Sequence, residues 1–344
     1  MKDISILLFI LFISHSAIGQ TKLVPHPEIT GKVSVNAPNL LAWPTDFPSK
    51  TPDLTEPTSN RIYDLHMQVN NCDAFDLIIS TGGNYHMALI DFWYESFLKE
   101  NELNNWYFTT SPPISPEQTE NKALSFSNVA LNCKPHVAIG PKVIMERLKT
   151  AGLAKGEPIL LFTNRGNVML VKKGNPKQIK SFWDLARTDV KVATPNPDTE
   201  KLSFGNYATS LYNIALNASD SDSALNYFNS VFDDNNWVSG KRIHHREVAH
   251  LVYTDLADAG LLFHHIARYV QKCFPDEFDI IPMGGTVEDP QPLAGTKIGK
   301  FFITRIEGDF SENQRVAREA FIESILAKDF DPYLLKHHIN PAER

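Results

Sequence analysis

Polar residues and glycines precede predicted helices at several points in the sequence. The first such run is Ser80, Thr81, Gly82, Gly83 and Asn84, which follows a strand expected over 75–80. Glycines let a ligand approach the backbone, and the hydroxyls and the amide supply side-chain donors. A helix that begins directly after the loop also presents free backbone N–H groups and the positive end of its dipole. The run is typical both of an oxyanion site and of an ordinary strand-to-helix turn.

Two further segments have the same arrangement. Gly140 lies between a strand expected over 137–139 and a helix expected to begin at Pro141, and Ser203 lies just ahead of a helix expected around 207–216. None of these loops is a GxGxxG dinucleotide fingerprint or a P-loop. Several helix N-termini that converge on one cleft would form a site able to hold an anion without Lys or Arg.

Histidine pairs occur at 244–245 and at 264–265. Adjacent residues do not share a helix face, so neither pair is a chelating unit, and HExxH is absent. Three interpretations remain open: a metal site built from His245 and His264, ordinary surface or hydrogen-bonded histidines, or His245, Arg246 and His264 as polar contacts to a ligand. The sequence has no G-x-S-x-G elbow and no catalytic cysteine signature. We therefore predict no enzyme activity and no cofactor.

The N-terminal segment resembles a cleaved leader. Lys2 precedes an apolar run over 4–13, and Ala17 and Gly19 have the spacing that a signal peptidase prefers. The run is shorter than the roughly 20 apolar residues that a spanning helix needs. No Cys follows it at the position of a lipoprotein. We expect residues 1–20 to be removed and the mature chain to be periplasmic or secreted.

Residues 21–72 are rich in proline and lack a helical or strand period, so we expect an extended arm there. From residue 73 onward, predicted strands and helices alternate, which favours an α/β protein with mainly parallel sheets. Strands are expected at 75–80, 137–139, 168–171, 190–194, 261–263, 278–281 and 298–304, and helices at 85–97, 141–152, 207–216, 224–232, 247–256 and 316–327, with a capping box of Ser181 and Asp184 before a short helix. The alternating segment from residue 73 onward is longer than one doubly wound sheet needs, so we expect two lobes.

Charge and cysteine content narrow the function classes. The 344 residues carry 33 Lys+Arg and 40 Asp+Glu, a net charge of -7, which excludes a general nucleic-acid partner. It does not exclude an anionic ligand, because local donors dominate within a screening length. An oxidising compartment permits one disulfide among three cysteines. We expect Cys72 to pair with Cys133, in one lobe, which leaves Cys273 as the odd thiol.

The middle of the chain resembles periplasmic solute-binding proteins of ABC importers, and more narrowly the molybdate, tungstate and sulfate branch. The similarity is carried by the first crossover strand, by a Lys-Ser-x-x-Asp-Leu segment, and by the next strand with its Asn-Pro loop. These are residues 164–176 (NRGNVMLVKKGNP), 179–187 (IKSFWDLAR) and 190–197 (VKVATPNP). The resemblance extends over about 73–340, but only 164–197 is specific.

The resemblance implies a type II two-lobed fold in which each lobe is a mainly parallel sheet flanked by helices. Lobe 1 would comprise 73–164 and 298–344, and lobe 2 would comprise 165–297. Two crossover strands, at 164–166 and near 297–301, would form the hinge that closes on a ligand. The first and second binding loops depart from the usual pattern, and His264 lies where a tyrosine is common. The resemblance therefore predicts the fold of this chain but not the identity of its ligand.

We therefore expect a monomeric solute-binding protein that captures a small anionic solute, such as molybdate, tungstate or sulfate, for a membrane permease. The expected ligand contacts are Ser80, Thr81, Gly82, Gly83, Asn84, Gly140, Ser203, His245, Arg246 and His264. One alternative is a metal ion held by His245, His264 and a carboxylate. Another is a secreted enzyme or sensor on the same fold, since fold does not fix function.

Overall fold

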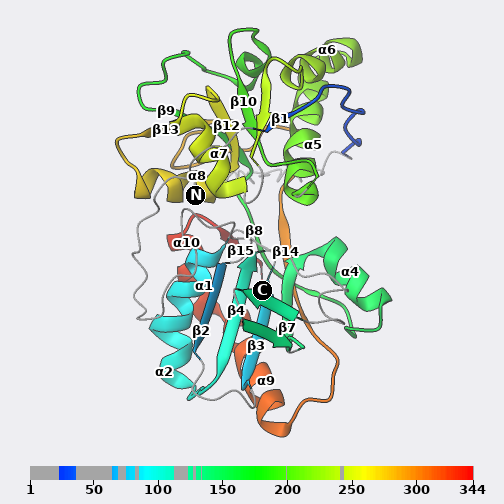
Figure 1. Cartoon of the computed structure of the whole chain (residues 1–344), viewed down its shortest axis with the longest axis vertical. Coiled ribbons are helices and arrows are strands. Elements are labelled where there is room, and N and C mark those ends of the chain that lie inside the picture. The colour runs from blue at the N-terminus through cyan, green and yellow to red at the C-terminus, as the bar shows by residue number, and fades with distance from the viewer. Residues whose placement is uncertain are drawn as a thin grey trace, which may run out of the picture.

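The computed structural model of the chain describes residues 23–35, 64–68, 75–81, 85–111, 123–126, 129–132, 134–198, 200–240 and 244–343. The predicted signal peptide, most of the predicted arm, and both expected disulfide partners, Cys72 and Cys133, lie outside the described residues. The described chain forms two lobes, one above the other in Figure 1, each built on its own sheet.

The lower lobe in Figure 1, lobe 1, has a seven-stranded sheet in the order β15-β8-β14-β7-β3-β4-β2. Its strands are β2 (Asp64–Gln68), β3 (Leu77–Thr81), β4 (Trp106–Ser111), β7 (Val137–Pro141), β8 (Ile159–Thr163), β14 (Lys300–Arg305) and β15 (Asn340–Pro341). Its helices are α1 (His86–Phe92), a π-helical turn (Trp93–Phe97), α2 (Leu98–Glu100), α4 (Lys142–Thr150), α9 (Glu312–Leu326), a 3-10 turn (Lys328–Phe330) and α10 (Asp331–Lys336). A separate antiparallel ribbon joins β5 (Ala123–Phe126) to β6 (Val129–Asn132).

Both faces of the lobe 1 sheet are covered. Val137 and Ile139 on β7 belong to the core shared with α1 and α9, whereas Ala138 between them belongs to the core under α4. This alternation is what a strand buried on both faces requires, because successive side chains point to opposite sides. The apolar composition of strands such as β3, whose Leu77, Ile78 and Ile79 are all buried, has the same cause.

The upper lobe, lobe 2, has a six-stranded sheet in the order β1-β11-β10-β12-β9-β13. Its strands are β1 (Ser34–Val35), β9 (Asn167–Lys172), β10 (Val192–Thr194), β11 (Trp237–Ser239), β12 (Ala259–Phe263) and β13 (Phe278–Pro282). Its helices are a 3-10 turn (Phe182–Ala186), α5 (Lys201–Ala218), α6 (Ser221–Val231), α7 (His244–Tyr253) and α8 (His264–Cys273). Among the described residues, no helix combines the length and hydropathy needed to cross a membrane.

The expectation of mainly parallel sheets is correct for lobe 2 and wrong for lobe 1. Among the described strands of lobe 2, neighbours in the row β1, β11, β10 and β12 pair in parallel. The strand β9 pairs antiparallel with both of its neighbours, β12 and β13. Among the strands of lobe 1 that the structure describes, only β3 pairs in parallel with its neighbours β4 and β7, and the other ladders are antiparallel. The difference arises because β8 and β14, next to the two connections between the lobes, together with the C-terminal β15 and the edge strand β2, all form antiparallel pairs in lobe 1.

Local signals predicted seven of the fifteen strands that the structure describes and most of the longer helices, with one correction at the start of α4. The capping box of Ser181 and Asp184 is present at the 3-10 turn. Pro141 precedes α4 as its N-cap rather than forming its first residue, and Val143 in the first turn is 44% exposed. The buried face of α4 is instead formed by Ile144, Met145 and Leu148.

Part of the predicted arm, residues 23–35, packs along lobe 2. The Val24 N–H donates to Asn213 Oδ1 at 2.9 Å, and Asn213 Nδ2 donates back to the Val24 carbonyl at 2.7 Å. His26 stacks on Phe228 with ring centroids 5.7 Å apart, and β1 then adds a parallel strand beside β11. This part of the arm therefore contributes to the core and to the sheet edge of lobe 2.

Candidate ligand-binding cleft

The strand register shows which edge of the lobe 1 sheet faces lobe 2. The strand β14 begins directly after the chain returns from lobe 2, and its Phe301 pairs with Pro141 at the end of β7. Because β14 and β7 are antiparallel, β7 ends on the side where the chain crosses between lobes. The parallel strand β3 ends beside it, with Thr81 opposite Ile139. The C-terminal edge of the β3–β7 pair therefore faces lobe 2.

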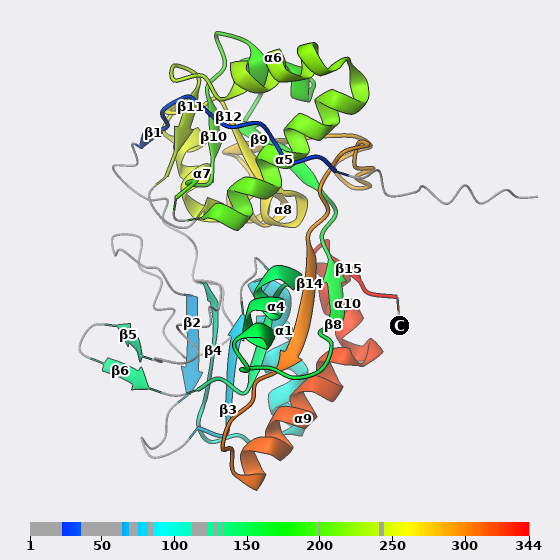
Figure 2. The same ribbon diagram turned by 90° about the vertical axis from the view of Figure 1, so that its right-hand side faces the viewer.

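The same reasoning orients lobe 2. The strand β9 begins directly after the first crossover, and its Asn167 pairs with Phe263 at the end of β12. Since β12, β10 and β11 are parallel, their C-terminal ends all lie towards lobe 1. The helices α1, α4, α5 and α8 follow β3, β7, β10 and β12, so all four begin at the space between the lobes, as Figures 1 and 2 show. Ligands of open α/β sheets bind at this edge, where strand order reverses.

The lobe 1 residues predicted to contact a ligand lie at this edge as far as they are described. Ser80 and Thr81 end β3, and Gly140 lies near the end of the adjacent β7, with Ser80 opposite Ala138. Thr81 is fully buried and Ser80 is partly buried. Gly82, Gly83 and Asn84, which complete the predicted loop, lie outside the described residues.

Tyr85 is a polar residue of this edge that sequence reasoning assigned only to a helix face. It is the N-cap of α1, its ring packs on Phe162 at 4.5 Å, and its hydroxyl lies next to the Thr81 side chain. Burial raises the pKa of the Tyr85 hydroxyl well above its ordinary value, and the Thr81 contact offsets this only in part. The phenol therefore stays neutral and able to donate. Beyond their mutual contact, neither buried hydroxyl has a hydrogen-bond partner among the described residues.

On lobe 2, the structure describes the side chains of Ser203 and His264. Ser203 lies in the first turn of α5, and its hydroxyl donates to Glu200 Oε2 at 3.4 Å. His264 begins α8 and is fully buried; its backbone N–H donates to the Gly166 carbonyl at 3.0 Å. His245 and Arg246 fall in the first turn of α7, but their side chains lie outside the described residues.

The surroundings of His264 determine the protonation state of its ring. Its Nε2 lies 2.6 Å from the Val287 carbonyl oxygen and therefore carries a hydrogen. Burial lowers the pKa of His264, and the charges of Arg165 and Arg268 lower it further, against the hydrogen bond to Val287. The neutral ring leaves Nδ1 as an acceptor, which has no partner among the described residues. His264 can donate to an anion only after Nδ1 is protonated.

Comparison with known proteins identifies the architecture. Residues 136–298 match the family model described as bacterial extracellular solute-binding protein, a segment that runs from β7 through lobe 2 to the second crossover. The sulfate-binding protein SubI from Mycobacterium tuberculosis H37Rv is 14% identical with a TM-score of 0.58, over 78% of this chain and 87% of SubI. The fold is that of type II periplasmic binding proteins.

Two further solved structures share this type II fold. Peb3 from Campylobacter jejuni is 17% identical with a TM-score of 0.51, over 77% of this chain and 99% of Peb3. AgtB from A. tumefaciens R10, in complex with agropinic acid, is 13% identical with a TM-score of 0.52, over 77% of this chain and 82% of AgtB. Comparison with curated proteins finds no match. At these identities the similarity shows the fold alone.

Within the type II fold, buried polar side chains join the two connections between the lobes. Asn164 Oδ1 accepts from Gly166 N–H at 3.1 Å and from Gly299 N–H at 3.0 Å, which links the first connection to the second. Ser210 Oγ on α5 accepts from Asn167 Nδ2 at 2.9 Å and from Lys297 N–H at 3.0 Å, and it donates to the Asn206 carbonyl at 2.8 Å. These bonds set how the connections leave lobe 2.

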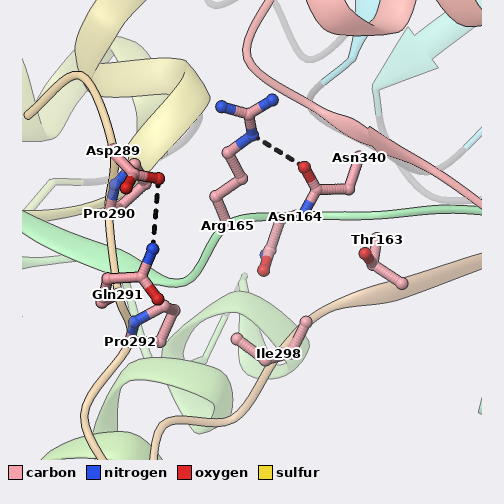
Figure 3. A pocket seen from close by; sticks show the side chains of 9 residues that line it. All are labelled: Thr163, Asn164, Arg165, Asp289, Pro290, Gln291, Pro292, Ile298 and Asn340. Atoms are coloured by element: carbon pink, nitrogen blue, oxygen red, sulfur yellow. Dashed lines mark hydrogen bonds between the residues drawn. The ribbon is translucent and has the colours of Figure 1, made fainter. Parts of the chain in front are cut away.

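A cavity of about 480 Å³ lies beside the first connection (Figure 3). Arg165 reaches into it and donates from Nε to Asn340 Oδ1 at 2.8 Å, while Gln291 Nε2 donates to Asp289 Oδ1 at 3.1 Å. None of the predicted ligand contacts that the structure describes, namely Ser80, Thr81, Gly140, Ser203 and His264, lines this cavity. Half of the predicted contacts, namely Gly82, Gly83, Asn84 and the side chains of His245 and Arg246, lie outside the described residues.

Proposed function

We propose that the chain is a periplasmic or secreted solute-binding protein that captures a small anion between its lobes and delivers it to the permease of an ABC importer. The observation that carries the proposal is the meeting of the C-terminal strand edges of both lobes, where α1, α4, α5 and α8 begin. Helix N-termini present N–H donors and a positive dipole end, which favour an anion. The match of residues 136–298 to a solute-binding family supports the same class of function.

The proposed contacts come from both lobes. Lobe 1 would contribute Ser80, Thr81, Gly82, Gly83, Asn84 and Gly140, and lobe 2 would contribute Ser203, His245, Arg246 and His264. The buried hydroxyls of Thr81 and Tyr85 support the lobe 1 half, because a buried donor without a partner is costly unless a ligand satisfies it. We place the hinge at 164–166 and near 297–301, and we propose that the mature protein acts as a monomer.

The anion is proposed to be an oxyanion such as molybdate, tungstate or sulfate. The test is a calorimetric titration of the mature protein with these three ions and phosphate. The Thr81→Val variant removes the hydroxyl without changing the volume, and we expect it to weaken binding about ten-fold. Thr304→Val is the matched control, because Thr304 is a buried threonine of the same sheet on β14. Absence of heat from all four ions, or equal effects of the two variants, would refute the oxyanion proposal.

A metal ion is the second candidate, favoured by the buried acceptor Nδ1 of His264. His245 and a carboxylate would complete such a site. The described residues contain no group of three or more His, Cys, Asp or Glu side chains placed to hold a metal. Bound zinc or iron in the purified protein, lost in His264→Ala, would establish this candidate. Purified protein without metal, and without a thermal shift on adding zinc, would exclude it.

A further inference from the structure

The cavity of about 480 Å³ in Figure 3, which we call the hinge cavity, lies behind the two connections between the lobes. In lobe 1 its lining residues come from β8 and β15, on one side of β14, whereas Thr81 and Gly140 lie on β3 and β7, on the other side. In lobe 2 its lining residues follow β13, and β9 separates β13 from β12 and β10, whose ends face the proposed cleft. The connections therefore stand between this cavity and the predicted ligand contacts.

Arg165 brings a largely unpaired guanidinium group to the hinge cavity. Its Nε donates to Asn340 Oδ1 at 2.8 Å, and this bond orients the side chain (Figure 3). Nη1 and Nη2 of Arg165 have no hydrogen-bond or ion-pair partner among the described residues. The parallel N–H groups of a guanidinium match the two oxygens of a carboxylate. Arg165 can therefore hold a carboxylate through two bonds at once.

Asn164 adds a buried donor beside Arg165. Its Oδ1 accepts from the N–H groups of Gly166 and Gly299, which fixes the orientation of the amide and leaves Nδ2 as the free end. Asn164 is 1% exposed, and its Nδ2 has no partner among the described residues. A buried donor without a partner is costly, so this amide points to an acceptor that the protein itself does not supply.

Asp289 supplies the opposite charge on the lobe 2 wall of the cavity. Its Oδ1 accepts from Gln291 Nε2 at 3.1 Å, and its carboxylate makes no ion pair among the described residues. Arg165 and Asp289 thus line one cavity without pairing with each other (Figure 3). Unpaired opposite charges on the walls of one cavity are complementary to a solute that carries both an ammonium and a carboxylate group.

The lobe 2 wall is held in place by its own backbone. Residues 284–291 form a tight hairpin, in which the Gln291 N–H donates to the Gly284 carbonyl at 3.1 Å and an antiparallel bridge closes the turn. Gly166 of the first connection has φ of +82°, and a Cβ at this position would lie 2.9 Å from Pro292 Cγ. The wall therefore packs against the connection at a point where only glycine fits. A wall that is fixed before a ligand arrives lowers the entropic cost of binding.

We propose that the hinge cavity binds a small zwitterion of the amino-acid class, with its carboxylate on Arg165 and Asn164 and its ammonium group on Asp289. A volume of about 480 Å³ lies within the range of small-molecule sites. The guanidinium group and the free amide N–H can only donate, and the Asp289 carboxylate can only accept, so a solute with a single charge leaves one wall unmatched. The site is separate from the proposed oxyanion cleft and does not rest on that proposal.

The probes are the twenty L-amino acids, each titrated calorimetrically into the mature protein at low ionic strength. We expect at least one to bind, and its carboxamide and N-acetyl derivatives, which each lack one charge, to bind at least about ten-fold more weakly. Arg165→Gln and Asp289→Asn should each weaken binding about ten-fold as well. Arg147→Gln and Asp276→Asn are the matched controls, because both side chains are exposed and neither lines the cavity. Circular dichroism confirms that each variant is folded.

Three results would overturn the proposal: no heat from any amino acid at millimolar concentration, weakening by the control variants as large as that by Arg165→Gln, or loss of amino-acid binding in Thr81→Val. The last result would place the amino acid in the cleft that the predicted contacts line. Retained amino-acid binding together with silence from all four oxyanions would refute the cleft proposal alone. The two proposals are therefore distinguishable in one set of titrations.

Discussion

Ser210 provides the sharpest test of how the lobes are connected. Its hydroxyl is fully buried and contacts three elements: Asn167 at the start of β9, Lys297 in the second connection, and Asn206 one helical turn earlier in α5. Replacement by alanine removes one oxygen and leaves the Asn167 amide N–H and the Lys297 backbone N–H without their acceptor. We therefore expect Ser210→Ala to destabilise lobe 2 far more than a serine-to-alanine change on a helix surface.

The magnitude follows from the two orphaned donors. A buried donor left without a partner costs about 1–3 kcal/mol. Asn167 is buried and the Lys297 N–H is part-buried, so the lower half of that range applies to the second donor. Loss of the bond from Ser210 to the Asn206 carbonyl adds little, because such back-bonds contribute little to helix stability. The sum is a loss of about 2–5 kcal/mol in the free energy of unfolding.

The assay is urea denaturation of the mature protein followed by circular dichroism. Ser230→Ala is the matched control, because Ser230 Oγ makes the same kind of bond to the Asn226 carbonyl at 2.9 Å but lies on the exposed side of α6. We expect the control to change the free energy of unfolding by less than about 0.5 kcal/mol. A loss below about 1 kcal/mol in Ser210→Ala would show that water or rearrangement satisfies both donors, and the reasoning would fail.

Two further predictions concern pH and the N-terminal segment. His136 is 1% exposed and accepts from the Ile78 N–H at 3.1 Å, and burial together with the charge of Arg318 lowers its pKa to about 4. Below pH 6.5 the folded state then binds fewer protons than the unfolded chain. The stability that the neutral, buried His136 contributes is therefore fully present above about pH 6.5 and is lost as pH falls towards 4, by at most about 3 kcal/mol. Urea titrations at pH 4.5 and 7 should show that His136→Gln reduces this difference; an unchanged difference would contradict the assignment. Asn213→Ala removes both bonds to Val24 and should lower the free energy of unfolding by about 1–3 kcal/mol. If residues 23–35 pack independently of Asn213, limited proteolysis at Lys32 will be no faster in this variant.

Elements with strong local signals were predictable from the sequence. The capping box at Ser181 depends only on neighbouring residues. The strands β3, β9 and β13 are short apolar runs bounded by turn residues, a pattern that is visible in the sequence. The helix α8 was missed, because His264 and His265 open it and only Ile266, Ala267 and Val270 give it an apolar face. The two-residue strands β1 and β15 exist only because a partner edge is available, which no local pattern reports.

The sequence predicts which strand ends form the candidate site, but not which side-chain groups there donate or accept hydrogen bonds. The loop after β3 was recognisable from its glycines, and the register places Thr81 opposite Ile139, the residue before Gly140. Tyr85 falls at the start of the helix expected over 85–97 and gives no local sign of a ligand contact, because only the tertiary fold brings its hydroxyl next to Thr81. His264 was expected as a polar contact or a metal ligand, and only its bond to Val287, 23 residues away in sequence, shows that Nδ1 is an acceptor at neutral pH.

The acidic net charge of the chain is compatible with an anion site between its lobes, because surface charges and the donors of an enclosed site act over different distances. At physiological salt, exposed charges farther away than about 8 Å are largely screened, so the -7 of the whole chain hardly reaches an enclosed site. The buried Thr81 hydroxyl and the helices α4, α5 and α8, which begin at the space between the lobes, would act on a ligand there over much shorter distances. Binding in the oxyanion cleft, where the donors are buried hydroxyls and backbone N–H groups, should therefore depend little on salt, which calorimetric titrations at low and high salt would measure. A steep loss of affinity with added salt would show instead that exposed cations hold the anion.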